Sequence, residues 1–302
     1  MILLTGAAGK TGKTILNRLI PHGVHVRSLV RNEQQAQEIR QLGSTDVAIA
    51  DLRDQQALSQ ALDGIHKIYF ICPNMTPDEV EIGRSLITLA KQKGIRRFVY
   101  HSVLHPQVEE MPHHWQKMRM EECLFKSGLD FTILQPCAYM QNILANWTSI
   151  IDEGIYPVPY DTSARISVVD LEDVAAAAEV VLTQMNHSHA IYELAGPQAL
   201  SQDEMAEVLT QEIGRPVKAV AIDRSDWAVN AQRSGLDENS IDTLLKMFEY
   251  YEHYGFQGNP NVLNSLLKKP ATKFVDFVKR THESRLRYGS NGQNGQNHHH
   301  RK

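Results

Sequence analysis

The chain opens with Met1-Ile-Leu-Leu-Thr-Gly-Ala-Ala-Gly-Lys-Thr-Gly12, and this stretch decides the fold. Ile2–Leu4 is a short apolar run of the kind found in buried parallel strands. Three glycines follow at the spacing G-x-x-G-x-x-G, and from Lys13 apolar residues recur every three or four positions, which indicates a helix. A second apolar run at 24–30 completes a strand, glycine turn, helix and strand within about thirty residues, the size of a βαβ unit.

A glycine turn between a strand and a helix is typical of dinucleotide-binding sites. Glycines let the backbone turn tightly and approach a pyrophosphate, while the free N–H groups and positive dipole end of the helix attract the phosphates. The alternative is an ordinary glycine-rich turn from strand to helix. The residues that we expect to hold the cofactor here are Gly6, Ala8, Gly9, Lys10, Thr11 and Gly12.

The end of the second strand indicates which dinucleotide is preferred. An NAD site has an acidic residue there, which accepts hydrogen bonds from the ribose hydroxyls. This chain instead has Arg31, whose guanidinium can pair with a 2′-phosphate in bidentate fashion, and Lys10 can add a second positive charge. The sequence therefore predicts that NADP(H) is preferred over NAD(H), the alternative being that Arg31 is only a solvated charge.

The composition fits a soluble globular protein of 302 residues, with 42% hydrophobic and 22% charged residues. A formal charge of −4 gives no general attraction to nucleic acid or to anionic membranes. There is no apolar run long enough for a transmembrane helix and no signal-peptide pattern, so we expect a cytoplasmic protein. The scattered cysteines and the histidine pairs lack metal-ligand spacing, and we expect no metal.

Strand and helix patterns alternate along the first half of the chain. Such alternation predicts an α/β fold with a Rossmann-type, doubly wound parallel sheet, here over residues 1–140. We interpret residues 141–287 as a smaller α/β substrate domain with segments that return to the first, and 288–302 as a disordered tail. Further strands are expected at 47–50, 67–72, 97–101, 130–135, 155–159, 165–168 and 190–194, and helices at 33–43, 58–62, 77–93, 115–127, 140–153, 170–184, 201–213 and 237–254, with a last helix around 274–278.

Motifs in both halves together resemble the NmrA-like family of atypical short-chain dehydrogenase/reductases. The resemblance covers about residues 1–287 and implies that the chain binds NADP(H), with bacterial NADPH:quinone reductases and triphenylmethane dye reductases most similar. The motifs are Thr5-Gly-Ala-Ala-Gly-Lys-Thr-Gly12, Val26-Arg-Ser-Leu-Val-Arg31, Ala50-Asp-Leu52, Leu134-Gln-Pro-Cys-Ala-Tyr-Met-Gln-Asn142, Ile166-Ser-Val-Val-Asp170, Asp173-Val-Ala175, Tyr192-Glu-Leu-Ala-Gly-Pro197 and Ile213-Gly-Arg-Pro216.

The resemblance also implies where the catalytic residues lie. The superfamily uses a serine after the fifth strand and a Tyr-x-x-x-Lys motif on the next helix. Ser102 and Lys117 stand at the serine and lysine positions, but His113 replaces the tyrosine. An imidazole can relay a proton near pH 7, and the adjacent His114 is a second candidate that faces the acceptor. The alternative is that both histidines belong to a solvated loop.

The remaining expected site residues follow the ends of strands, where open α/β sheets bind ligands. We expect Asp51 and Leu52 beside the adenine. Cys72, Pro73 and Asn74 should lie along the second ribose, and Pro136 and Cys137 beside the nicotinamide. Tyr139 and Met140 are expected at the acceptor, where Tyr139 could stack on an aromatic ring.

These features predict an NADPH-dependent oxidoreductase that transfers hydride to a small, flat, electron-poor acceptor such as a quinone or a dye. A second hypothesis is an NADP(H)-sensing regulator of the NmrA type, which acts through a protein partner. A third is a nucleotide-sugar epimerase, although that chemistry depends on the missing tyrosine. The sequence leaves open whether the working unit is a monomer or a homodimer.

Overall fold

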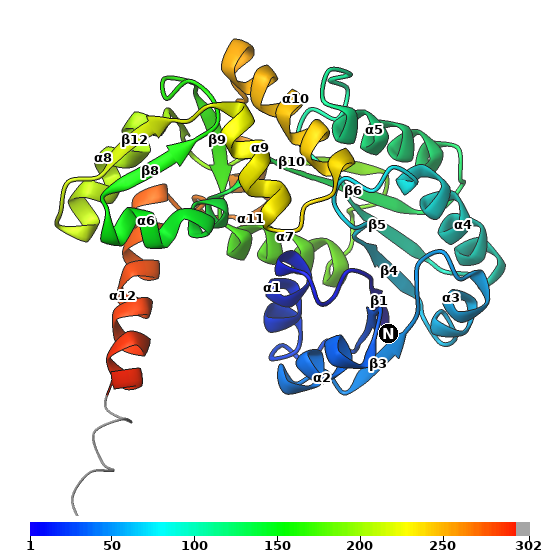
Figure 1. The fold of residues 1–302 in the computed structure, drawn as a ribbon. Coiled ribbons are helices and arrows are strands. Elements are labelled where there is room, and N and C mark those ends of the chain that lie inside the picture. The colour runs from blue at the N-terminus through cyan, green and yellow to red at the C-terminus, as the bar shows by residue number, and fades with distance from the viewer. Residues whose placement is uncertain (294–302) are drawn as a thin grey trace, which may run out of the picture.

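A parallel sheet forms the centre of the computed structural model, which describes residues 1–293, with side chains to residue 286. The seven strands lie in the order β10-β6-β5-β4-β1-β2-β3, and every neighbouring pair is parallel (Figure 1). The predicted doubly wound α/β fold is confirmed. The strands are β1 (Ile2–Leu4), β2 (Val26–Val30), β3 (Asp46–Ile49), β4 (Lys67–Phe70), β5 (Arg97–His101), β6 (Phe131–Pro136) and β10 (Ala190–Leu194).

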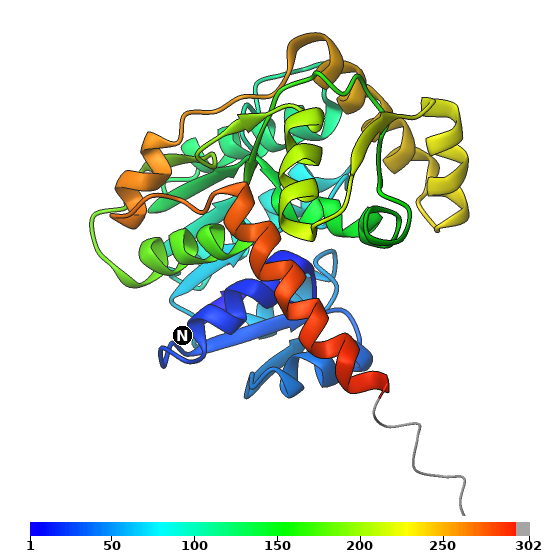
Figure 2. The same ribbon diagram turned by 90° about the vertical axis from the view of Figure 1, so that its left-hand side faces the viewer.

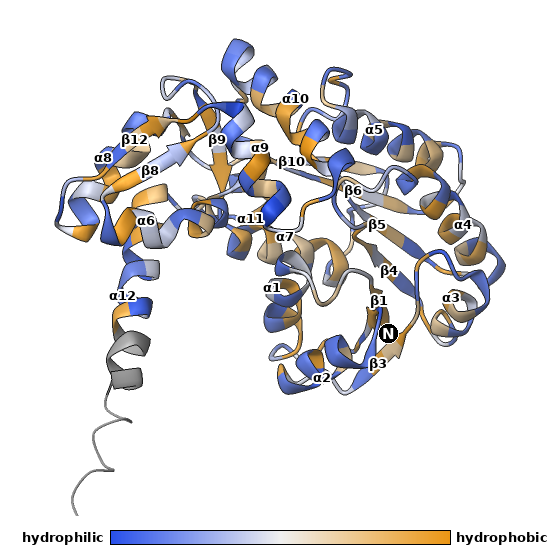
Figure 3. Cartoon of the chain, in the orientation of Figure 1, coloured by the Kyte–Doolittle hydropathy of each residue, from blue (hydrophilic) through white to orange (hydrophobic). Residues whose placement is uncertain are grey.

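Helices cover both faces of this sheet because alternate residues of each strand point to opposite sides. Ile2 and Leu4 join the core under α1 (Lys10–Leu19), α2 (Glu33–Gln41) and α7 (Leu171–Thr183). Leu3 joins the core under α3 (Gln55–Ala61), α4 (Glu79–Gln92) and α5 (Pro112–Phe125). Figure 3 shows apolar residues, in orange, gathered along the strands.

The second half of the chain both returns to this sheet and builds a region of its own. Its strand β10 pairs with β6, and its helix α7 packs against α1. The other strands form two small sheets, with β9 (Ile166–Val169) between β7 (Ala138–Tyr139) and β11 (Ala199–Leu200), and β8 (Ile155–Val158) beside β12 (Lys218–Ala221). The other helices are η1 (Met140–Asn146), α6 (Trp147–Asp152), α8 (Gln202–Ile213), α9 (Arg224–Arg233), α10 (Glu238–Tyr254), α11 (Asn261–Leu267) and α12 (Phe274–Gln293).

Several elements differ from the expectation, and α9 and α11 were not predicted. Helix α5 begins at Pro112, because proline suits the first helical position, so His113 and His114 lie on a helix and not on a loop. The segment 140–153 divides into the 3₁₀-helix η1 and α6. Helix α12 continues to Gln293 and runs outward beyond α8, against which it packs (Figures 1 and 2). Of the predicted disordered tail, residues 294–302 lie outside the described residues.

The strand order creates a crevice at one edge of the sheet. From β1 the chain first builds outward through β2 to β3, and then crosses back to β4 on the other side of β1. The connections that follow β1 and β4 therefore separate to opposite sides, which opens a binding site beyond the carboxyl ends of these strands. Within residues 1–293 no helix is both long and apolar enough to cross a bilayer.

Candidate active site

A cleft of about 900 Å³ occupies this crevice and extends toward the second half of the chain. Its walls include every residue expected to hold the cofactor, from Gly6 to Cys137. The expected reaction residues Ser102, His113, His114, Lys117 and Tyr139 also line it. Met140 does not, because its side chain is only 1% exposed and packs into the core, so its expected contact with the acceptor is wrong.

The glycine turn is held in one shape by contacts to the neighbouring strand. Gly6 adopts a φ of +61°, which favours glycine, and the Thr5 hydroxyl donates to the carbonyl of Ile71 at 2.8 Å. The N–H of Ile71 donates back to the same hydroxyl. A side chain at Gly12 would place Cβ 2.3 Å from the Gly6 oxygen, so only glycine lets α1 begin this close to the turn.

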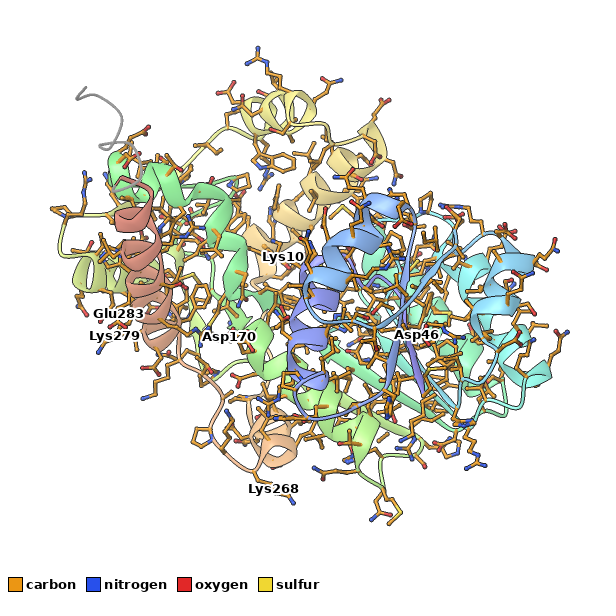
Figure 4. The ribbon with its side chains drawn as sticks, turned by 90° about the horizontal axis from the view of Figure 1, so that it is seen from below. Lys10, Asp46, Asp170, Lys268, Lys279 and Glu283 are labelled. Carbon is orange, nitrogen blue, oxygen red and sulfur yellow. The ribbon has the colours of Figure 1, made fainter. Side chains whose placement is uncertain are left out.

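The N-terminus of α1 presents backbone donors to the cleft that have no side-chain cap within residues 1–293. Its N-cap is Gly9, which provides no side-chain acceptor for the first N–H groups of the helix. Lys10, the first residue of α1, adds a cation at the same place (Figure 4). Backbone donors, the helix dipole and an ammonium together suit a pyrophosphate, so the residues present fit a bound dinucleotide.

Two cations at the nucleotide end differ in whether they already have partners. Arg31 follows β2, and its backbone N–H donates to Gln35, but its guanidinium makes no ion pair within the described part of the chain. Arg53 instead donates twice to Asp78, at 2.7 and 3.0 Å. Asp51, expected at the adenine, accepts from the N–H of Arg53. Gln35 and Arg53 also line the cleft and were not predicted, because no local motif marks them as ligands.

Lys117 is buried and paired with a carboxylate that the sequence analysis missed. Its Nζ donates to Glu79 Oε1 at 2.9 Å and lies over the ring of Tyr100, whose hydroxyl donates to the same oxygen at 2.6 Å. Glu79 begins α4, and its side chain is 2% exposed. The pair neutralises the ammonium, which still has two N–H donors for a ribose.

Ser102 also has a carboxylate partner. Its hydroxyl donates to Glu121 of α5, which in addition accepts from the side-chain amide of Gln135. Burial raises the pKa of Glu121, while these two hydrogen bonds act in the opposite direction. Because Ser102 donates its proton to Glu121, it faces the cleft mainly as an acceptor.

His113 and His114 are buried, and both are neutral near pH 7. Burial lowers the pKa of His113 to about 2 and that of His114 to about 4. His114 Nδ1 contacts the carbonyl of His105 at 3.2 Å. His113 Nδ1 is buried without a hydrogen-bond partner among the described residues. Neither ring is therefore protonated before the reaction, and neither can act as an imidazolium general acid.

Tyr139 belongs to a chain of hydrogen bonds at the same place. Its hydroxyl lies 2.7 Å from His101 Nε2, and His101 Nδ1 lies 2.8 Å from the hydroxyl of Tyr69. Burial lowers the pKa of His101 to about 3, with the positive charge of Lys117 as a second cause. No local sequence pattern indicates this series of hydrogen bonds, because its three residues come from the ends of three different strands.

The far end of the cleft carries no formal charge among the described residues. All of its aspartate, glutamate, lysine and arginine lining residues precede residue 118, whereas residues 136–256 contribute only neutral side chains in the described structure. Aromatic rings dominate this end, with Trp227 edge-on to Phe248 and Tyr251 stacked on Phe256. The aromatic lobe consists of Tyr156, Tyr160, Trp227, Phe248, Tyr251 and Phe256.

The cysteines in the cleft are not activated. Burial raises the pKa of Cys72, and it raises that of Cys137 to about 12, so both stay protonated thiols near pH 7. Among the described residues no group of three or more His, Cys, Asp or Glu side chains is placed to hold a metal ion.

The sheet, the glycine turn and the crevice define a Rossmann-type dinucleotide-binding protein. The model of the NmrA-like family matches residues 1–287, and the chain belongs to this family.

Relatives of known name are similar over nearly their whole length. The NAD(P)H azoreductase of Xenophilus azovorans is 30% identical over 281 residues, which cover 92% of this chain and 97% of the relative. Quinone oxidoreductase 2 of Escherichia coli (strain K12) is 28% identical over 280 residues, with the same coverage.

Solved structures agree with these relatives. The NADPH complex of the Escherichia coli NADPH-dependent quinone oxidoreductase superposes with a TM-score of 0.81 at 27% identity and covers 93% of this chain and 100% of that one. The Citrobacter sp. triphenylmethane reductase complexed with NADP(H) has a TM-score of 0.81 at 20% identity, with 93% and 99% covered, which shows the shared fold.

Proposed function

We propose that this NAD(P)H-dependent oxidoreductase of the NmrA-like family uses NADPH to reduce a flat aromatic acceptor, such as a quinone or an azo dye. The observation that carries the proposal is the division of the cleft. One end combines the glycine turn with Arg31 and Lys10, and the other is the uncharged aromatic lobe. The names of the relatives, an azoreductase and a quinone oxidoreductase, support the same acceptors.

The aromatic lobe argues against a nucleotide-sugar substrate. Such a substrate carries a diphosphate, which requires cationic side chains or helix N-termini. Lysine and arginine are absent from residues 136–256 of the cleft wall as the structure describes it. Stacking on Tyr160, Trp227 or Tyr251 would instead favour an apolar ring system.

The chain's own residues would bind and position the reactants. Bound NADPH would supply the hydride, and the protein orients the donor and the acceptor. Lys117, fixed by Glu79, would hold a ribose hydroxyl, and the neutral His113 would contribute its imidazole as a hydrogen-bonding wall. Ser102 would accept a hydrogen bond, since its own proton is donated to Glu121.

A first test is to follow NADPH absorbance with a panel of quinones and azo dyes. Acceptor-dependent oxidation of NADPH is expected, and Lys117→Ala should lose at least about tenfold in kcat/KM. A Lys117→Ala variant with full turnover and unchanged cofactor affinity would refute the role of Lys117. Tight NADPH binding without turnover on any acceptor would favour the regulatory hypothesis.

The preference for NADPH is proposed to rest on Arg31 and Lys10, because neither side chain has a carboxylate partner in the described structure. In Arg31→Ala the NADPH dissociation constant should rise by about tenfold or more, while that for NADH changes little. Arg53→Ala is the control for a nearby arginine already paired with Asp78. An unaltered ratio of the two dissociation constants in Arg31→Ala would contradict the proposal.

A further inference from the structure

The acceptor needs a proton as well as a hydride, and the side chains expected to provide it are unsuited to the task. His113 and His114 are neutral, and Ser102 donates its proton to Glu121. The hydroxyl of Tyr139 is a candidate, because it lines the cleft together with the residues of the glycine turn and lies 2.7 Å from His101 Nε2, whereas Lys117 is paired with Glu79.

The direction of the hydrogen bonds follows from the burial of Tyr69. Its side chain is completely buried, and His101 Nδ1 is the partner of its hydroxyl within the described residues. A buried hydroxyl proton needs an acceptor, so Tyr69 donates to Nδ1. A neutral imidazole carries one proton, which must then lie on Nε2. His101 therefore donates to the oxygen of Tyr139 and does not accept its proton.

This order leaves the Tyr139 proton available to the cleft. Tyr139 Oη accepts from His101 Nε2 at 2.7 Å, and the Thr11 side chain lowers the pKa of Tyr139 as a donor to the same oxygen does, so the Tyr139 O–H can point to a bound molecule. We propose that Tyr139 is the proton donor to the acceptor, and that Tyr69 and His101 are positioning residues that keep its proton free. The inference rests on the proposed reductase function.

Reduction of a quinone takes up one hydride and one proton. The acceptor gains hydride from NADPH, which is oxidised, and the negative charge collects on a carbonyl oxygen of the acceptor. The Tyr139 O–H bond breaks, and a new O–H bond forms on that oxygen. The resulting phenolate keeps the hydrogen bond from His101 Nε2–H, and water in the cleft returns the proton. Burial, which raises the pKa of Tyr139 to about 12, keeps its hydroxyl protonated before the reaction.

Acceptors that differ in their need for a proton provide the kinetic test. A triphenylmethane dye cation becomes neutral when it takes a hydride and needs no proton, whereas a quinone needs one. In Tyr139→Phe, kcat for a quinone should fall about a hundredfold, the size of a lost general acid, while dye reduction and the dissociation constant of NADPH change little. A solvent isotope effect on quinone reduction should change in the same variant.

The positioning residues have a matched control elsewhere in the molecule. Tyr69→Phe removes the donor to His101 Nδ1, which lets the ring change tautomer and accept the Tyr139 proton, so quinone kcat should fall with unchanged NADPH affinity. Tyr192 makes the same kind of contact to His187 Nδ1, at 2.8 Å, outside the cleft. Tyr192→Phe should therefore leave the kinetics intact.

A measurement without turnover separates this inference from the proposed function. Nitrogen-15 NMR of histidine-labelled protein, with His101 assigned from a His101→Asn sample, should show the Nε2–H tautomer. The Nδ1–H tautomer, or equal quinone turnover by Tyr139→Phe and the unmodified protein, would overturn the proton-donor role. Failure of the unmodified protein to reduce any acceptor would overturn the reductase function instead.

Discussion

Single side chains set the chemistry of the cleft through buried partners. Lys117 lines the cleft, and its charge is balanced by Glu79, which is far from it in sequence and also accepts from Tyr100. The three groups form one buried unit. A change at Glu79 therefore acts on the whole unit and not on one contact.

Glu79→Gln should destabilise the protein by about 3 kcal/mol, because it leaves the buried Lys117 ammonium without a negative partner. Urea unfolding measures the loss. Asp63→Asn is the control, since Asp63 pairs with Lys93 at an exposed site and should cost less than about 1 kcal/mol. Equal losses in the free energy of unfolding would show that the buried pair contributes no more to stability than the exposed pair.

Buried histidines should make stability depend on pH. His113 and His114 keep pKa values of about 2 and 4 when folded, against about 6.5 in an unfolded chain. As pH falls from 6.5 to 4, the unfolded state binds more protons, so the free energy of unfolding falls by up to about 1.4 kcal/mol per pH unit for each histidine. Glu121 opposes this trend above its unfolded pKa, because its folded pKa is raised.

Urea unfolding between pH 7 and pH 4.5 measures this slope, and His114→Asn should reduce it. His253→Asn, on the exposed surface, is the matched control. A slope unaffected by His114→Asn would mean that the pKa of His114 is the same in the folded and unfolded states.

At the scale of elements, close approaches decide which residues are allowed. Gly12→Ala should separate α1 from the turn, since Cβ would lie 2.3 Å from the Gly6 oxygen. We expect NADPH affinity to fall more than about tenfold, because misplaced donors no longer match the phosphates. Gly94→Ala is the control. No atom lies near the added Cβ, so only the positive φ should destabilise this variant, by about 1–2 kcal/mol, and its NADPH affinity should be unchanged. Calorimetric titration distinguishes the two.

Helix α12 provides the cationic partner of a buried aspartate at the start of α7. Asp170 is fully buried, caps α7, and accepts from Gln141 and from Arg280 of α12. Figure 4 labels Asp170 and, on α12, Lys279 and Glu283. Truncation after residue 286 should retain the fold, whereas truncation after residue 273 removes Arg280 and the buried Phe277 and should abolish soluble expression or cost more than about 3 kcal/mol. Thermal unfolding of both truncated chains provides the measurement.

The sequence predicted those features whose residues lie close together along the chain. The glycine turn and the alternation of strands and helices depend on short segments, and the structure has both of them. Glu79 and the Tyr69–His101–Tyr139 chain could not be predicted, because their partners come together only through the sheet. Met140 was misplaced because the periodicity of η1, not its closeness to Tyr139, decides which way it faces.

At the scale of the whole molecule, the two halves share one core. Ile2 and Leu4 belong to the same buried cluster as Val174 and Leu194. We therefore expect one cooperative unfolding transition, with fluorescence and circular dichroism midpoints that coincide. Residues 1–140 expressed alone should not fold, since α7 and β10 would be missing; a folded fragment would contradict the shared core.

The position of β10 also has a consequence during synthesis. Strand β6 ends at Pro136, but the strand that covers its free edge is not complete until Leu194. While the intervening chain is made, β6 presents unpaired backbone groups that can pair with another nascent chain. Because the closing contacts span long sequence separations, they form late, and the growing polypeptide should depend most on chaperones over this interval.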